Sequence, residues 1–218
     1  MDRKTLFWLA IAAVGCTQTV RGNVIPIGTS GAPDLFGAQS AVTLLATVLD
    51  PFSVGATSGT LQAAVYRDTG GGLDFVYQVN VTTTASAVNF LNVFGYTGFP
   101  TADEGYVTNG ASLPAGLFVN GSVIPTSVFR ATDRIAFTIT GVSTSQSSSV
   151  LEVQTAATTF GSAVAQVAGG DGQTGNLAAF APIANAPEPA SIFLVGGGLL
   201  ALGGLTRRVA IRIRSEIR

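Results

Sequence analysis

Short runs in which apolar and polar residues alternate, separated by clusters of turn-forming residues, constrain this chain more than any other feature. The clearest run is 73–79 (LDFVYQV), in which Leu73, Phe75, Tyr77 and Val79 alternate with other residues. Side chains of a β-strand point alternately to its two faces, so these four share one face. The preceding stretch 68–72 (DTGGG) supplies the glycines of a tight turn. The pattern predicts a β-hairpin formed by 61–67 and 73–79.

The rest of the region 23–185 shows the same pattern. It is rich in Gly, Thr, Ser, Val and Ala and poor in the helix-forming residues Lys, Glu and Met. A buried strand or a short helix, ended by Asp50-Pro51, is expected at 41–49. Further strands are expected at 87–94, 117–124, 135–142, 150–155 and 163–167, with loops or turns at 95–110, 143–149 and 169–175 and a linker at 178–186. The predicted fold class is all-β, an antiparallel β-sandwich.

Residues 1–22 have the features of a secretory signal peptide. Arg3 and Lys4 form a basic start, and the apolar run 6–15 is too short to span a membrane alone. Cys16 is the single cysteine. The tetrapeptide Ala13-Val14-Gly15-Cys16 resembles the lipobox at which bacterial lipoproteins are cut and acylated, so lipidation is an alternative to loss of Cys16 with the signal peptide. In both cases the mature domain is expected to have no disulfide.

A second apolar segment, 191–205 (SIFLVGGGLLALGGL), contains no charged residue. As a helix it would be about 22 Å long, shorter than a hydrocarbon core of about 30 Å. Arg207 and Arg208 follow it, and the positive-inside rule places this basic end in the cytoplasm and the domain outside. Before it stands Pro187-Glu188-Pro189, whose prolines fix φ and remove backbone donors. We expect an extended strand that a peptidase cleft can bind, followed by a temporary membrane anchor.

The tripeptide, the apolar segment and the arginine pair together resemble the PEP-CTERM sorting domain of Gram-negative bacteria. The resemblance implies recognition by exosortase, a membrane cysteine peptidase-transpeptidase, with cleavage near the tripeptide. Transfer to the cell surface or the exopolysaccharide matrix would follow. The resemblance assigns the sorting motif to Pro187, Glu188 and Pro189, and the basic stop to Arg207 and Arg208. The tail after Arg208 continues for ten residues (VAIRIRSEIR), where many members of the family end.

The expected organisation has four parts. A signal peptide occupies 1–22, an extracytoplasmic β-rich domain 23–185, the sorting and anchor segment 186–210, and a basic cytoplasmic tail 211–218. Phrases such as 58–66 and 147–160 also resemble the ectodomains that often accompany this sorting signal. That resemblance implies a secreted β-rich domain and supplies no activity.

Charge and missing residue types narrow the possible functions of 23–185. The region has three arginines, no lysine and nine acidic residues, a net charge of −6. An acidic surface argues against nucleic acid or anionic lipid as a partner. The chain has no histidine, which excludes Ser-His-Asp and Cys-His catalysis and an ordinary zinc site. We predict no catalytic residue, no cofactor and no metal.

Four local patterns could still carry chemistry. Asp68-Thr69-Gly70 is the tripeptide of aspartic peptidases, but the chain has no second copy and a hairpin turn is favoured. The stretch 171–176 could line a calcium loop, yet it lacks the alternating acids of a strong motif. Asp103-Glu104 is expected to be a solvated pair in a loop, although two carboxylates about 5–9 Å apart would suit a glycosidase. Thr82-Thr83-Thr84 could bind ice or sugar, or form the exposed side of a strand.

The favoured function is a non-catalytic protein of the cell surface or biofilm matrix. A carbohydrate-binding module for exopolysaccharide is an alternative, for which Tyr96 and Tyr106 are the one hint. A carboxylate-dependent glycosidase is the third hypothesis. Exposed aromatic residues gathered along a groove would favour the second, and two convergent carboxylates in a cleft would favour the third.

Overall fold

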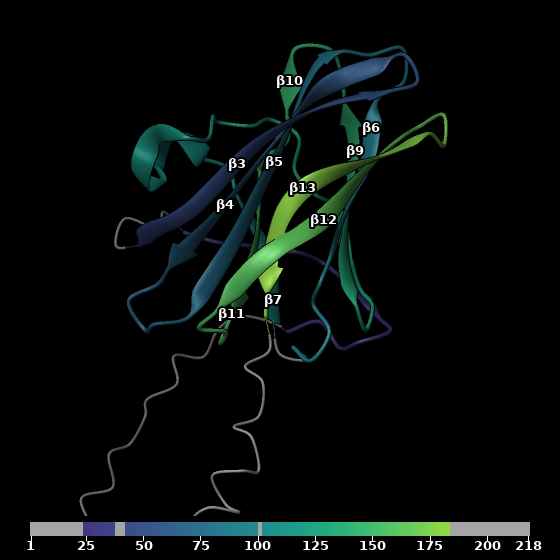
Figure 1. The fold of residues 1–218 in the computed structure, drawn as a ribbon. Coiled ribbons are helices and arrows are strands. Elements are labelled where there is room, and N and C mark those ends of the chain that lie inside the picture. The colour runs from purple at the N-terminus through teal and green to yellow at the C-terminus, as the bar shows by residue number, and fades with distance from the viewer. Residues whose placement is uncertain (1–23, 38–41, 100–101, 184–218) are drawn as a thin grey trace, which may run out of the picture.

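The computed structural model describes residues 24–37, 42–99 and 102–183, which form two β-sheets that face each other (Figure 1). Sheet A has the strand order β1-β8-β9-β6-β12-β13, and sheet B the order β2-β7-β11-β5-β4-β3, with β10 paired to β5. The predicted all-β class is confirmed. The prediction that all pairing is antiparallel is wrong in one place, because β2 runs parallel to β7.

The strands of sheet A are β1 Ser30–Gly31, β6 Val88–Phe94, β8 Ser127–Arg130, β9 Arg134–Val142, β12 Phe160–Gly169 and β13 Thr174–Pro182. Those of sheet B are β2 Asp34–Leu35, β3 Thr43–Val54, β4 Thr57–Arg67, β5 Leu73–Thr83, β7 Ala102–Val107, β10 Gln146–Ser147 and β11 Val150–Thr155. Two short 3₁₀ turns, η1 Gly110–Ser112 and η2 Pro114–Gly116, complete the described elements.

Alternate residues of both sheets form one core between them. Leu73, Phe75, Tyr77 and Val79 of β5 lie in it, each with no exposed surface, as the alternation predicted. The hairpin is confirmed, since β4 pairs antiparallel with β5. In its turn the Asp68 N–H donates to the Gly72 carbonyl at 3.0 Å, and Gly71 adopts a φ of +88°, which glycine tolerates.

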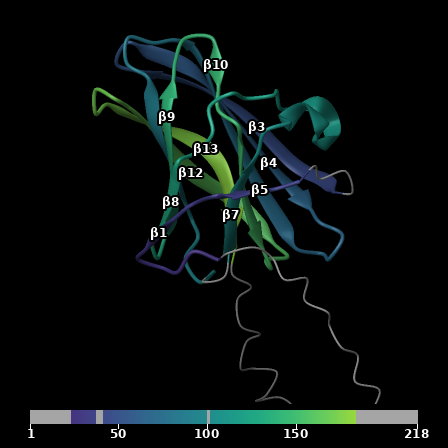
Figure 2. The ribbon, with the colours of Figure 1, turned by 180° about the vertical axis from the view of Figure 1, so that it is seen from behind.

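Part of the outer face of sheet B is covered by the irregular segment 108–125, which includes η1 and η2 (Figure 2). Leu113 and Phe118 from this segment join Tyr66, Val76 and Val150 in a second buried cluster. The predicted strand at 117–124 is therefore wrong. Phe118 is buried on sheet B and Leu117 packs beside it, whereas Val119 and Ile124 are 52% and 47% exposed. In the described part of the segment, a single bridge between Val123 and Ser148 is the β-pairing.

Four other predicted boundaries are wrong, and the first is the turn predicted at 143–149, which contains the short strand β10 paired with β5. Strand β3 does not end at Asp50-Pro51 but continues to Val54. It is an edge strand, so the sheet can accommodate a proline, which lacks an N–H, without losing a hydrogen bond between strands. The strand is also half exposed along much of its length, not buried. The predicted loop 95–110 contains β7, and the predicted linker 178–186 begins inside β13, which pairs with β12 up to Pro182.

Within the described part of the chain, no helix has both the length and the apolar character needed to cross a membrane. The predicted signal peptide at 1–22 and the apolar segment at 191–205 lie outside the described residues.

Candidate functional site

The sorting residues Pro187, Glu188 and Pro189 and the basic stop Arg207 and Arg208 lie outside the described residues. The structure does show how the folded domain ends before them. The N–H of Ile183 donates to the Thr159 carbonyl at 3.1 Å, and the Thr159 hydroxyl donates to the Ile183 carbonyl at 2.9 Å. The domain is therefore hydrogen-bonded as far as Ile183, shortly before the tripeptide.

A buried ion pair joins the two sheets. Arg130 ends β8 of sheet A and Glu104 lies on β7 of sheet B, and neither side chain is more than 1% exposed. One guanidinium nitrogen of Arg130 (Nη1) donates to Glu104 Oε1, and the other (Nη2) donates to the Phe99 carbonyl. Because arginine stays charged, a buried guanidinium needs a carboxylate of this kind beside it.

Two tyrosines continue the polar contacts from this pair across the core. The Arg130 Cζ atom lies 6.0 Å from the centre of the Tyr96 ring. The Tyr96 and Tyr77 hydroxyl oxygens are 3.0 Å apart, and the Tyr77 hydroxyl donates to the Phe180 carbonyl of β13 at 2.5 Å. Burial raises the pKa of both tyrosines, so both stay neutral. We refer to Arg130, Glu104, Tyr96 and Tyr77 as the buried polar group.

This arrangement overturns two predictions. Asp103 and Glu104, predicted as a solvated pair in a loop, are neighbours on β7, 2% and 1% exposed. They point to opposite faces of the strand and cannot act together on one substrate. Tyr96, half of the predicted hint of an exposed aromatic groove, is 1% exposed, and its partner in that hint, Tyr106, is partly buried against the core.

Burial raises the pKa of the Glu104 carboxyl to about 7. The hydrogen bond from Arg130 and its positive charge lower this pKa, but the effect of burial is larger. A carboxyl that binds its proton more tightly when folded stabilises the fold at low pH. Between about pH 4.5 and 7 the folded state binds the extra proton, so the free energy of unfolding falls as the pH rises.

We predict that the free energy of unfolding decreases by up to about 3 kcal/mol between pH 5 and pH 8 through Glu104, and that Glu104→Gln removes this part of the pH dependence. Urea denaturation of both proteins across this range measures the difference. An identical slope in the two proteins, or a wild-type stability that rises relative to Glu104→Gln, would contradict the assignment.

Three further acids lie on the outer face of sheet B. Strand register places Asp74, Gln154 and Asp103 in one row across β5, β11 and β7, and Gln154 Nε2 donates to Glu152 Oε1 at 2.7 Å. Asp74, Asp103 and Glu152 are each at most 2% exposed. Within the described ranges, no group of three or more His, Cys, Asp or Glu residues is arranged to hold a metal ion. These carboxylates are shielded from solvent and do not line an open cleft.

The remaining patterns are turns or internal contacts. Asp68 lies in the β4–β5 turn, as predicted, and its carboxylate accepts the Gly72 N–H at 2.9 Å. Asp171 lies in the turn between β12 and β13 and accepts the Gln173 N–H at 3.1 Å. Of the threonine run, Thr83 lies 2.6 Å from the Ser58 hydroxyl and Thr84 2.7 Å from that of Thr57. These side chains are engaged in holding local structure.

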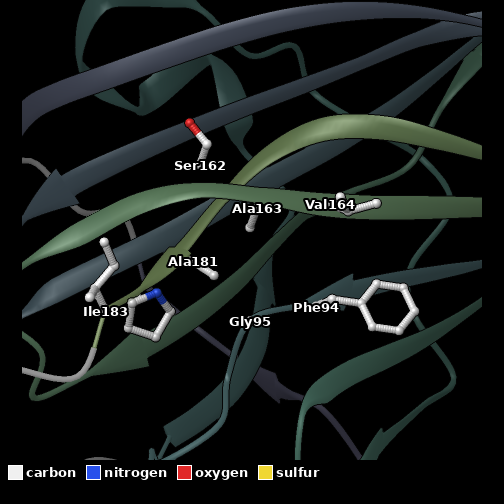
Figure 3. A pocket seen from close by; sticks show the side chains of 8 residues that line it. Phe94, Gly95, Ser162, Ala163, Val164, Ala181 and Ile183 are labelled. Carbon is white, nitrogen blue, oxygen red and sulfur yellow. The ribbon is translucent and has the colours of Figure 1, made fainter.

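A shallow hollow of about 440 Å³ lies where β6 ends beside β12 and β13. Figure 3 shows Phe94 and Ile183 at opposite sides of it, with Ala163 and Ala181 between them. Its lining residues carry no charge and no titratable group: Phe94, Gly95, Ser162, Ala163, Val164, Ala181, Pro182 and Ile183. The hollow has a surface for contact but no groups for acid–base chemistry.

Comparison with known proteins identifies the segment that follows the domain. Residues 185–208 match the PEP-CTERM protein-sorting motif, a range that includes the tripeptide and both arginines of the basic stop. No curated protein and no solved structure matches the chain. The chain thus carries a PEP-CTERM protein-sorting motif at residues 185–208 and is an exported substrate of an exosortase.

Proposed function

We propose that the chain is a non-catalytic protein of the cell surface or extracellular matrix of a Gram-negative bacterium. The observation that carries the proposal is the position of the sorting motif. The β-structure is hydrogen-bonded up to Ile183, and the motif begins at residue 185. The folded cargo is therefore the two-sheet domain, and the sorting signal follows it directly.

The route follows from the motif and from the chemistry of its residues. The signal peptide 1–22 starts export, and the apolar segment 191–205 holds the chain in the membrane with Arg207 and Arg208 inside. Two prolines keep Glu188 in an extended strand in front of the membrane. Exosortase cuts near this strand, and the domain leaves its anchor.

The side chains of the domain support a non-catalytic role. The whole chain has no histidine, and its single cysteine lies within 1–22. Of the nine acids in the described residues, Asp74, Asp103, Glu104 and Glu152 are buried, and Asp68 and Asp171 lie in turns. The other three, Asp34, Asp50 and Asp133, are partly or fully exposed. A glycosidase needs two carboxylates that face one open site. The buried carboxylates do not meet that requirement, so the glycosidase hypothesis has no support from their geometry.

Fractionation of cells that lack the exosortase gene tests the proposal. In the wild type we expect the protein at the cell surface or in the medium, and in the deletion strain we expect it in the membrane fraction. An unchanged location in the deletion strain would contradict the sorting role. Incorporation of labelled palmitate would show instead that Cys16 is lipidated. The released protein is also expected to free no reducing sugar from polysaccharides.

A further inference from the structure

The two sheets differ in what lies on their outer faces. On sheet B the segment 108–125 covers part of the outer face, and its Leu113 and Phe118 are buried there. On sheet A, strand register places six residues in one row across all six strands: Ser30, Phe129, Ala136, Asn92, Gln166 and Asn176. In the described part of the chain, each of the six is partly or fully exposed. We call this row and its neighbours the open face of sheet A.

The open face presents aromatic rings and amides together. Phe129 in the row is 36% exposed, and Phe90 in the adjacent row is 42% exposed. Strand β9, with Ala136 and Thr138, lies between the two rings. The amide of Asn92 is next to Phe90 on β6, Gln166 follows on β12, and Gln166 Nε2 donates to Asn176 Oδ1 at 3.2 Å. The adjacent row adds the hydroxyls of Thr138 and Thr174 through the pairs Thr138–Phe90 and Ala168–Thr174. Apolar contact area on β8, β9 and β6 therefore lies beside a run of neutral amides on β6, β12 and β13.

The open face is neutral, whereas the domain as a whole is acidic. The region 23–185 has a net charge of −6, yet these two rows contain no charged residue. Arg134 lies at the rim, with its Cζ atom 5.8 Å from the centre of the Phe94 ring. Beside Phe94 the shallow hollow of Figure 3 continues the apolar surface. Such a face neither attracts cations nor provides the basic cluster that an anionic chain requires.

We propose that the open face of sheet A binds a neutral polysaccharide chain. The faces of Phe90 and Phe129 carry partial negative charge, which attracts the polarised C–H groups of a pyranose ring. The amides of Asn92, Gln166 and Asn176 can both donate to and accept from sugar hydroxyls. Strands about 4.8 Å apart make the six-strand row about 24 Å long, which suits an extended chain better than a single sugar. This inference names a ligand class for the proposed surface protein, and it rests on that proposed function.

Affinity gel electrophoresis tests the proposal with protein purified from whichever host fraction holds it, so that a failure of sorting does not prevent the assay. The gels contain hydroxyethylcellulose, galactomannan, xylan, starch or the host's own neutral polysaccharide, with alginate as the anionic comparison. We expect retardation by at least one neutral polymer. Phe90→Ala/Phe129→Ala and Gln166→Ala should each weaken binding at least tenfold.

The matched control is Leu49→Ala/Ile124→Ala, which removes exposed apolar side chains elsewhere, 59% and 47% exposed. It should bind as the wild type does. The proposal is overturned if no neutral polymer retards the protein, if alginate alone does, or if the two phenylalanine substitutions leave binding unchanged in a folded protein. It is also overturned if sedimentation shows a dimer that Phe90→Ala/Phe129→Ala dissociates, because the face would then be occupied by a second copy.

Discussion

Replacement of Arg130 by methionine is expected to lower the free energy of unfolding by about 3–5 kcal/mol. The substitution keeps apolar volume but removes the charge that faces Glu104 inside the core, where neither side chain is more than 1% exposed. It also removes the donor to the Phe99 carbonyl. Since a domain of this size is stable by about 5–15 kcal/mol, this single change would remove a large part of the total. Urea denaturation of the purified protein measures the loss.

Arg134→Met is the matched control for this experiment. Arg134 is partly exposed and lies over the Phe94 ring, so its removal should cost no more than about 1 kcal/mol. A double-mutant cycle adds Glu104→Leu. Removing both partners of a buried ion pair costs less than the sum of the single changes, because no isolated charge remains. Equal losses for Arg130→Met and Arg134→Met, or strict additivity in the cycle, would show that the buried pair does not join the sheets.

Replacing Pro187, Glu188 and Pro189 by alanines is expected to reduce the released protein at least tenfold and to leave the uncut chain in the membrane. Alanines favour helix, so the extended strand offered to the peptidase would be lost together with its one charge. Immunoblots of the membrane and medium fractions measure the ratio of uncut to released protein.

The control replaces Ser215, Glu216 and Ile217 by alanines. It changes the same number of residues and also removes one glutamate, but outside the matched range 185–208. Release should be normal. If the tripeptide variant is released as the wild type is, or if both variants are retained equally, the tripeptide is not the recognised feature.

Local patterns in the sequence predicted the parts of the fold that depend on local chemistry. The alternation in 73–79 predicted both the strand and its buried face, because one residue in two meets the core. The glycines of 68–72 predicted its turn. The sorting motif is equally local, because the order of tripeptide, apolar segment and arginines predicted a segment at 186–210 that overlaps the matched range 185–208.

The features that sequence reasoning missed depend on residues far apart in the chain. Glu104 is hydrophilic by itself and is buried because Arg130 lies opposite it, on another sheet. Tyr96 is buried because Tyr77 and Arg130 surround its hydroxyl and ring. Likewise 117–124 is apolar enough for a strand, and only the shape of sheet B shows that it packs on a face and pairs through a single bridge. Arg130, which follows the apolar pair Val128-Phe129 in an otherwise acidic domain, was the available sign of a buried partner.

The intact mass of the protein recovered outside the cell tests the central claim most directly. Sorting by exosortase predicts a mass for a chain that begins after the signal peptide and ends before the apolar segment 191–205, without Arg207 and Arg208. It also predicts that this species disappears when the exosortase gene is deleted. A recovered protein whose mass includes 191–218, or the same shortened mass in the deletion strain, would contradict the account.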